Sequence, residues 1–399
     1  MLSSGPKLRR LRIIHVGPDS QFLQFAAKSF EAVAPGANEY IVTTDSDNRV
    51  LRFPIPDGKV RVVSSHPRGV VSVLFKLRDS DMIVAHGMTT HAAITFVCAR
   101  KRVMTAWSGW GFDYYGSDKS SNDGLLGEST LSLLASLQKE KSRRGLFVHL
   151  LKDFLWYPIA RNLTRRAAAR ANYFSAPIPS DESVFRDRFP EFQGQYSQLS
   201  YASLVDTFAH TGRPNGSGGD ILVGNSASFT NNHLEVLDLL ARLDIGDRKI
   251  VVPLSYGEPV YRNAILARGQ ELFGSAFLPL IDRLPLDQYV ALVANCDVVI
   301  MNHKRQQGLG NIGAALYNGA HVFLDKANPV FTFLHSRGAT VHTTAQLAND
   351  GLPVQPVTLE EVANNRNVLE SFWGTEQVVK NVETLLAQLE FTGRPKWRR

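Results

Sequence analysis

The sequence predicts an α/β protein with two doubly wound, Rossmann-like domains that face a cleft. Short apolar runs alternate with helical stretches, which is typical of parallel sheets flanked by helices. The pattern stops and then restarts near Ile221, and 399 residues are enough for two hydrophobic cores. The most glycine-rich and turn-prone stretch, 210–220, separates the two sets and is interpreted as a linker.

The first domain is predicted to span residues 1–209. Its apolar runs are short enough for strands, and helical patterns lie between several of them. The expected strands are 11–16, 39–43, 60–63, 82–86 and 102–107, and the expected helices include 21–33 and 91–99.

The second domain is predicted to span 221–375, with a C-terminal helix and a basic tail over 376–399. Parallel strands expose their carboxyl ends to a crevice, so two successive domains of this kind place a ligand cleft between them. The expected strands are 221–223, 249–253, 277–280, 298–302, 321–324 and a short run near Val341.

The bulk composition indicates a globular protein of the reducing cytosol. Hydrophobic residues make up 44% and charged residues 20% of the chain, which argues against extended disorder. Cys98 and Cys296 lie far apart at the edges of apolar runs, as small buried hydrophobes do. Residues 1–10 contain no apolar stretch of signal-peptide length, and no later run reaches the roughly 20 residues of a spanning helix. We therefore expect neither export by that route nor integral membrane insertion.

A basic amphipathic segment is predicted at 138–174. It holds nine Lys or Arg residues against two acidic ones, an excess as large as the +7 net charge of the whole chain. Aromatic and aliphatic residues alternate with these charges, which suits a surface helix among anionic lipid headgroups. A core helix with a solvated basic face explains the pattern equally well. Nucleic-acid binding ranks last, because the tryptophans elsewhere cluster in a single motif and no helix-turn-helix, zinc-finger or ribonucleoprotein pattern appears.

The most informative motif is Arg305-Gln306-Gln307-Gly308-Leu309-Gly310-Asn311, between a predicted strand and a predicted helix. A strand, a glycine-rich turn and a helix start together form a backbone nest that can hold a phosphate, with Arg305 as counter-charge. Taken alone, the two glycines are explained better by tight packing of the strand against the helix.

The wider sequence favours the phosphate interpretation, because it resembles the TDP-N-acetylfucosamine:lipid II N-acetylfucosaminyltransferase family, glycosyltransferase family 56. The resemblance is close from about 219 to 345 and looser before that. This chain departs from the family pattern in two places. It has Ser108 where the family has a histidine, and it carries an extra stretch of thirty-odd residues after Tyr115, up to about Leu151. The motifs that carry the resemblance are Ile221 to Ser226, Asn231, His233, Val251 to Gly257, Leu286 to Tyr289, Cys296-Asp297, Arg305 to Asn311, His15, Ala85-His86-Gly87 and Trp107 to Tyr115.

The resemblance implies the two-domain GT-B fold, with a last helix that crosses back to the first domain. It also implies a reaction: a deoxy-amino sugar moves from a dTDP-sugar donor to a polyprenyl-diphosphate-linked saccharide, at the cytoplasmic face of a bacterial inner membrane. No metal or other cofactor is expected, since backbone amides, the helix dipole and Arg305 can stabilise the departing diphosphate.

The donor is expected to bind to the second domain. Asn225 and Ser226 follow a strand, although by residue type alone they are better explained as helix caps. Tyr256 is expected to stack on or line the base pocket, and Asn328 to close it, although a turn tyrosine is usually half-buried packing. The complete expected set is Asn225, Ser226, Tyr256, Arg305, Gln306, Gln307, Gly308, Gly310, Asn311 and Asn328.

The first domain is expected to supply the general base and the acceptor site. Asp113 is the first candidate for the base, because aromatic faces could shelter a sugar there and raise a carboxyl pKa. His86 and Asp19 follow, and each of the three has a structural alternative as a turn cap, a core residue or a helix cap. The expected acceptor-binding residues are Trp107, Trp110 and Tyr115.

Three alternatives stay open. The acidic triplets 45–47 and 79–81 could hold a divalent cation in a metal-dependent transferase, or they could be solvated turns. The nearest competing enzyme is a nucleotide-sugar epimerase, or another transferase, of the same fold that acts on a different sugar. A membrane-associated protein that binds a sugar nucleotide without catalysis is the competing non-enzyme.

Overall fold

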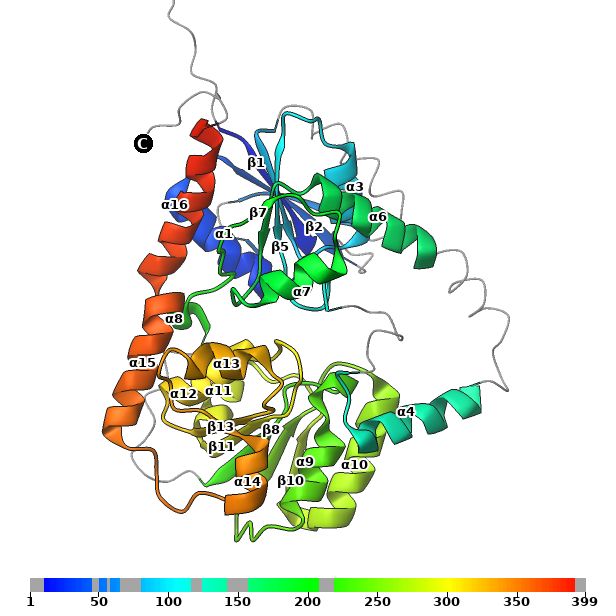
Figure 1. The fold of residues 1–399 in the computed structure, drawn as a ribbon, viewed down its shortest axis with the longest axis vertical. Coiled ribbons are helices and arrows are strands. Elements are labelled where there is room, and N and C mark those ends of the chain that lie inside the picture. Colours follow the sequence, from blue (N-terminus) through cyan, green and yellow to red (C-terminus); the bar gives the residue numbers. More distant parts are fainter. Residues whose placement is uncertain are drawn as a thin grey trace, which may run out of the picture. The chain divides into compact units, whose positions relative to one another are not determined.

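The computed structural model describes residues 11–44, 50–55, 58–64, 80–115, 124–141, 157–207 and 219–391. The chain divides into two compact units, each built around a parallel sheet (Figure 1). Unit 1 comprises Met1–Ser117, Val148–Ser203 and Thr375–Arg399, and unit 2 comprises Asp118–Phe147 and Leu204–Gly374.

Unit 1 contains a seven-stranded parallel sheet in the order β3-β2-β1-β4-β5-β6-β7. The two short strands β6 and β7 were not predicted, because two or three residues leave no readable periodicity. The strands are β1 (Ile13–Pro18), β2 (Asn38–Thr44), β3 (Lys59–Ser64), β4 (Met82–His86), β5 (Met104–Ser108), β6 (Tyr173–Ser175) and β7 (Gln195–Tyr196).

Helices cover both faces of this sheet. In Figure 1, α1 and α16 lie together on one side and α3 and α6 on the other. The side chain of Ser20 accepts a hydrogen bond from Leu23 N and so caps α1, whose apolar side is buried. The helices are α1 (Gln21–Val33), α3 (Thr90–Cys98), α6 (Tyr157–Arg170), α7 (Asp181–Arg188) and α16 (Thr375–Phe391).

Unit 2 contains a six-stranded parallel sheet in the order β10-β9-β8-β11-β12-β13. Its strands are β8 (Asp220–Val223), β9 (Ile250–Pro253), β10 (Phe277–Leu280), β11 (Cys296–Met301), β12 (His321–Leu324) and β13 (His342–Thr343). Its helices are α4 (Glu128–Lys141), α8 (Leu204–Thr207), α9 (His233–Leu240), α10 (Pro259–Phe273), α11 (Leu286–Ala294), α12 (Leu309–Tyr317), α13 (Pro329–His335), α14 (Thr344–Asp350) and α15 (Leu359–Trp373).

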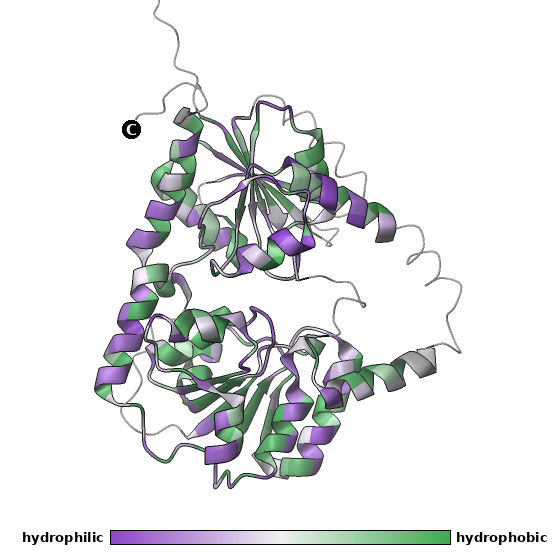
Figure 2. Ribbon diagram, viewed as in Figure 1, coloured by the Kyte–Doolittle hydropathy of each residue, from purple (hydrophilic) through white to green (hydrophobic). Residues whose placement is uncertain are grey.

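Hydrophobic burial explains both sheets. The central strands β1, β4, β8 and β11 are almost entirely buried, as strands covered on both faces must be. Figure 2 shows the strands as mainly hydrophobic, whereas many helices carry one hydrophobic and one hydrophilic face. The helices therefore bury one stripe each against a sheet.

The observed units differ from the predicted domains around α4. The sequence places this stretch inside a first domain of 1–209, but α4 and the turn before it pack on α9 of unit 2. Glu235 accepts hydrogen bonds from the amide and the hydroxyl of Thr130, at 2.9 and 2.7 Å, and Asn232 Oδ1 accepts one from Gly127 N at 2.8 Å. These partners are more than 100 residues apart, so no local pattern could have placed them together.

The last described helix, α16, packs in unit 1. Val382, Leu385 and Leu386 of α16 share a buried cluster with Ile13 of β1 and Phe30 of α1. This is the arrangement expected for the last helix. Most of the predicted linker 210–220 and the tail 392–399 lie outside the described residues.

Candidate functional site

The strand order of unit 2 reverses between β8 and β11. Chain connections leave this point in opposite directions, and ligands of such sheets bind outside the carboxyl ends of these strands. Asn225 follows β8 and His303 follows β11, so the sequence places polar side chains at this position.

A hydrogen-bonded network joins the two strand ends. His303 Nε2 lies 2.7 Å from Asn231 Oδ1 and 3.2 Å from Asn225 Oδ1, while Asn225 N donates to Asn231 Oδ1 at 2.9 Å. Burial, with smaller contributions from Arg305 and His233, holds the pKa of His303 well below its ordinary value. His303 is therefore neutral, and its Nε2 is the protonated nitrogen because both partners are oxygens.

Gln307 continues this network to Arg305. Its Nε2 donates to Asn225 Oδ1 at 3.1 Å, and its Oε1 accepts from Thr230 Oγ1 at 2.7 Å and from Arg305 Nε at 3.0 Å. The bond at Nε orients the half-buried side chain of Arg305 beside the start of α12. Arg305 and Gln307 therefore lie where the sequence predicts the phosphate site.

The predicted glycine-rich turn forms the N-terminus of α12. Gly308 adopts the left-handed conformation with φ of 65°, which favours glycine, and no side chain caps the helix. The amides of Leu309, Gly310 and Asn311 precede the first N–H that bonds within the helix, that of Ile312 to Gly308 O. No acidic residue lies in the first turn. The helix dipole and these amides can hold an anion.

Tyr256 lies beside this network. Its hydroxyl accepts a hydrogen bond from Asn225 Nδ2 at 3.2 Å, and its side chain is 61% exposed. The exposed ring is available for stacking on a base, as the sequence predicts for this residue.

Four other predicted donor residues are held inside unit 2. Ser226 is buried and accepts from Asn231 Nδ2 at 3.2 Å, and Asn328 is buried and caps α13 through Val330 N at 2.9 Å. The prediction that Asn328 closes the pocket is therefore corrected, since its side chain has a capping role. Gln306 is buried, and Asn311 Nδ2 donates to the hydroxyl of Tyr289 at 2.9 Å, which joins α12 to α11.

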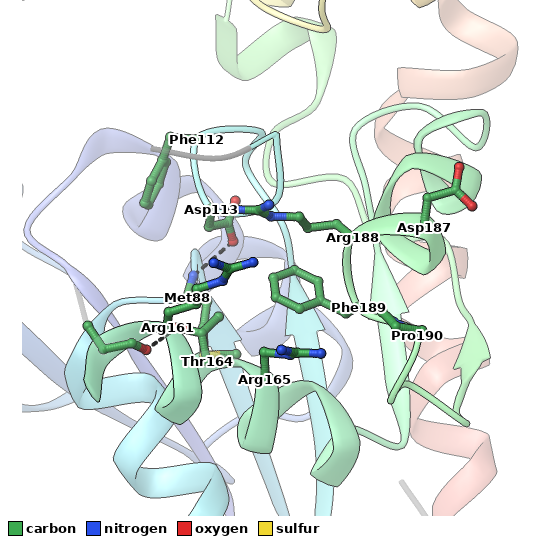
Figure 3. A pocket seen from close by; sticks show the side chains of 11 residues that line it. Met88, Phe112, Asp113, Arg161, Thr164, Arg165, Asp187, Arg188, Phe189 and Pro190 are labelled. Carbon is green, nitrogen blue, oxygen red and sulfur yellow. Dashed lines mark hydrogen bonds between the residues drawn. The ribbon is translucent and has the colours of Figure 1, made fainter. Parts of the chain in front are cut away.

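Unit 1 contains a separate cavity of about 440 Å³. Residues from the loops after β4 and β5, from α6 and from the end of α7 surround it (Figure 3). Its lining is Met88, Phe112, Asp113, Ala160, Arg161, Thr164, Arg165, Asp187, Arg188, Phe189 and Pro190. A cavity of this size is ordinary for a small-molecule site.

Asp113 is the predicted base that lines this cavity. Its Oδ2 accepts hydrogen bonds from Met88 N at 2.8 Å and Trp107 Nε1 at 2.6 Å, and its Oδ1 accepts from Trp110 N at 2.9 Å. Burial raises the pKa of Asp113, although these three donors oppose the rise. The carboxylate thus has a fixed orientation and increased basicity. Its Oδ1 accepts only one of these three hydrogen bonds.

Two of the three predicted acceptor-binding residues have structural roles. Trp107 is completely buried against Phe174, Phe185 and Phe189, so the prediction that it contacts the acceptor is wrong. Tyr115 donates to the buried carboxylate of Asp181 at 2.7 Å.

Trp110 is the more accessible tryptophan of the motif. It is partly exposed and packs against Phe22 and Phe112. Phe112, which the sequence analysis did not single out, is 48% exposed and lies at the cavity.

The other two predicted bases have structural roles as well. His86 is buried, its Nε2 lies 2.9 Å from His15 Nδ1, and burial holds its pKa well below the ordinary value. Asp19 accepts from Arg52 N at 2.7 Å and from Phe53 N at 3.0 Å, so it anchors a loop. The alternative of a helix cap at Asp19 is also corrected, because Ser20 caps α1.

Sequence reasoning missed two features of unit 1. Asp181 joins Tyr114 and Tyr115, at 2.5 and 2.7 Å, and so fixes the end of the aromatic motif. Arg161 and Arg188 line the cavity with Asp113. Arg161 lies in the basic segment 138–174, whose excess of positive charge pointed to an anionic ligand or surface. Arg188 lies in α7, where no sequence pattern indicated a binding residue.

The metal alternative gains no support from Asp81. This residue precedes β4, and its Oδ2 accepts a hydrogen bond from Arg12 N at 3.0 Å. It therefore lies at the amino ends of the strands, opposite to the carboxyl ends. The triplet 45–47 and Asp79 lie outside the described residues. In the described ranges, no three His, Cys, Asp or Glu residues are grouped as a metal site, and no helix is long and apolar enough to cross a membrane.

Comparison with a known family gives a match in the second half of the chain. Residues 196–358 match the model described as 4-alpha-L-fucosyltransferase, glycosyl transferase group 56. This confirms the family predicted from the sequence. The matched segment contains the network around Asn225 and the Gly308 turn, whereas the cavity around Asp113 lies outside it.

Solved structures share the fold at low sequence identity. The Anabaena protein HepE in complex with UDP and glucose has a TM-score of 0.66 and 14% identity, covering 95% of this chain and 100% of that one. Sucrose-phosphate synthase from Thermosynechococcus elongatus has a TM-score of 0.62 and 12% identity, covering 96% and 100%. The lipopolysaccharide outer core galactosyltransferase WaaB has a TM-score of 0.57 and 10% identity, with the same coverage. The predicted fold of two Rossmann-like domains, GT-B, is confirmed.

Proposed function

We propose a specific reaction for this chain, which is a glycosyltransferase of the GT-B class: transfer of a deoxy-amino sugar from a dTDP-linked donor to a polyprenyl-diphosphate-linked saccharide. The observation that carries the proposal is the uncapped N-terminus of α12 at the strand-order reversal of unit 2, inside the matched segment. The identities of the sugar and of the lipid follow from the family resemblance.

Unit 2 binds the donor in this proposal. The amides of Leu309 to Asn311 and the guanidinium of Arg305 contact the diphosphate, and the exposed ring of Tyr256 stacks on the base. When the bond between the sugar C1 and the diphosphate oxygen breaks, the electron pair leaves with dTDP. The helix dipole and Arg305 stabilise that charge, so the proposed reaction needs no metal ion.

Unit 1 supplies the base. Asp113 accepts the proton of the acceptor hydroxyl while the hydroxyl oxygen forms the new bond to the sugar C1. Its raised pKa suits this role, and the three hydrogen bonds prevent the carboxylate from rotating away. His86 and Asp19 are not needed for this step.

Membrane attachment belongs to the same proposal. Helix α6 exposes Ile159 and Arg161, an apolar and a basic residue, as a peripheral helix on an anionic surface does. The more apolar part of the basic segment, 142–156, lies outside the described residues. The proposed location is the cytoplasmic face of a bacterial inner membrane.

Calorimetric titration with dTDP, UDP and GDP tests the donor site, in EDTA and again with magnesium or manganese. We expect dTDP to bind most tightly, without a metal, and to lose roughly tenfold or more in affinity in Arg305→Ala, as removal of a charge-assisted hydrogen bond does. Arg242→Ala, at an exposed position at the end of α9, is the control and should bind normally.

Three results would contradict parts of the proposal. Absence of any nucleotide binding would reject the phosphate site in the Gly308 turn. Preference for UDP would replace the dTDP donor, and a strict requirement for metal would replace the metal-free mechanism. Turnover of donor with and without acceptor then separates a transferase, an epimerase and a protein that only binds.

A further inference from the structure

The cavity of unit 1 is basic on the side formed by α6 and α7. Arg161 and Arg165 come from one face of α6, because positions 160, 161, 164 and 165 are adjacent on a helix surface. Arg188 is the last residue of α7. Figure 3 shows the guanidinium groups of Arg161 and Arg188 on the side of the cavity where Asp113 lies.

Two of these arginines are available to a ligand. Arg165 is paired with Glu191, at 2.6 Å from Nε and 2.5 Å from Nη2 to the same oxygen. For Arg161 and Arg188, no hydrogen bond or ion pair is found with any residue that the structure describes. The carboxylates at the cavity are Asp113, which already accepts three hydrogen bonds, and the exposed Asp187.

The cavity also has an apolar part. Phe112 is 48% exposed, and Met88, Phe189 and Pro190 line the wall with it. Two guanidinium groups beside an apolar wall suit a ligand with a phosphate or diphosphate attached to a hydrocarbon or to the face of a sugar. Arginine is the residue best suited to this, because its planar fork of donors matches two phosphate oxygens.

We propose that this cavity binds the diphosphate of a prenyl-diphosphate-linked acceptor, through Arg161 and Arg188. The inference rests on the proposed function and deepens it, since it assigns the acceptor's anionic group to named residues of unit 1. Asp113 lies at the same cavity, so a saccharide attached to the bound diphosphate has a carboxylate beside it. The basic face of α6 thus recognises substrate, in addition to any contact with lipid headgroups.

The test is calorimetric titration of the full chain with farnesyl diphosphate, in the presence of saturating dTDP so that the donor site is filled. We expect binding in the wild type and at least roughly tenfold weaker binding in Arg161→Ala and in Arg188→Ala. Arg166→Ala is the matched control: it removes the same exposed side chain from the same helix, outside the cavity lining, and should bind as the wild type does.

Several outcomes overturn the proposal. These are unchanged binding in both cavity variants, equal weakening in Arg166→Ala, or no binding by the wild type. A second arm uses vesicles of phosphatidylglycerol in phosphatidylcholine. If Arg161→Ala and Arg188→Ala weaken vesicle binding but leave farnesyl diphosphate binding intact, these arginines contact lipid headgroups and the acceptor assignment is wrong.

The assignments of the cavity and of the donor site can be rejected independently of each other. Farnesyl diphosphate titrated without dTDP, into the wild type and Arg305→Ala, reports the cavity alone. Binding that depends on Arg161 in a protein that does not bind dTDP would keep the cavity assignment and reject the donor site. Loss of farnesyl diphosphate binding in Arg305→Ala but not in Arg161→Ala would place the diphosphate in unit 2 and reject the cavity.

Discussion

The two sheets share one strand order and use it differently. In each sheet the order in which strands are added reverses between the first and fourth strands along the chain, which are β1 and β4 in unit 1 and β8 and β11 in unit 2. In unit 1 this point is occupied by His15, 2.9 Å from His86 and 3.1 Å from Asn38, all buried. In unit 2 the equivalent network reaches the exposed Tyr256 and the uncapped start of α12.

The strand order places a reversal point in both sheets, and the side chains at that point determine whether its polar groups are buried or exposed. The histidine pair at the reversal point of unit 1 is buried, and the cavity of that unit is lined instead by the loops after β4 and β5 and by α6 and the end of α7. In unit 2 the polar network at the reversal point includes the exposed ring of Tyr256. We therefore expect ligand binding to respond to changes at the reversal point of unit 2, and stability to respond at that of unit 1.

The largest expected effect concerns Asp113. Asp113→Asn should lower kcat by roughly 10²- to 10⁴-fold, the usual contribution of a general base, with unchanged affinity for dTDP. Steady-state kinetics with a lipid-linked acceptor measures this. Asp247→Asn, at an exposed carboxylate of unit 2 outside the cavity and outside the Gly308 turn, is the control and should keep its activity. A folded Asp113→Asn enzyme with full turnover would show that Asp113 only positions its loop.

The second effect tests whether the reversal point of unit 1 is core. Burial lowers the pKa of His15 from 6.5 to about 4, so the unfolded chain binds a proton more readily. The stability provided by neutral His15 is complete above pH 6.5 and is lost as the pH falls toward 4, by about 3 kcal/mol. Urea unfolding at pH 7 and pH 4 should show the advantage of wild type over His15→Asn shrinking by that amount. A constant difference between the two proteins would mean that His15 is open to solvent.

The smallest effect concerns the turn before α12. Gly308→Ala forces a side chain into a left-handed conformation and should cost about 1 kcal/mol of stability. Its Cβ would also lie 3.3 Å from His303 Cε1 and 3.5 Å from Asn225 Cγ, so dTDP affinity should fall as well. Gly246→Ala has similar strain, with φ of 58° and open space around it, and should lose stability alone. Equal dTDP affinity in the two variants would separate the Gly308 turn from donor binding.

Local sequence determined most of the elements and the glycine-rich turn proposed to hold the diphosphate. Apolar runs located β4, β10 and β12, and the pattern of 21–33 located α1, because period and burial are local properties. The turn from Arg305 to Asn311 was recognisable for the same reason: a strand, two glycines and a helix start are contiguous in the chain.

Only the tertiary structure decided which side chains are accessible and which distant segments meet. Trp107 and His86 stand beside glycines in strand-end motifs, and nothing local distinguishes a buried member of such a motif from an exposed one. Asp181 meets Tyr114 across 67 residues, and Thr130 meets Glu235 across 105. Arg161 and Arg188 share a cavity because two helices pack on one sheet. Such contacts depend on the tertiary packing of distant segments, and the local sequence around each partner does not indicate them.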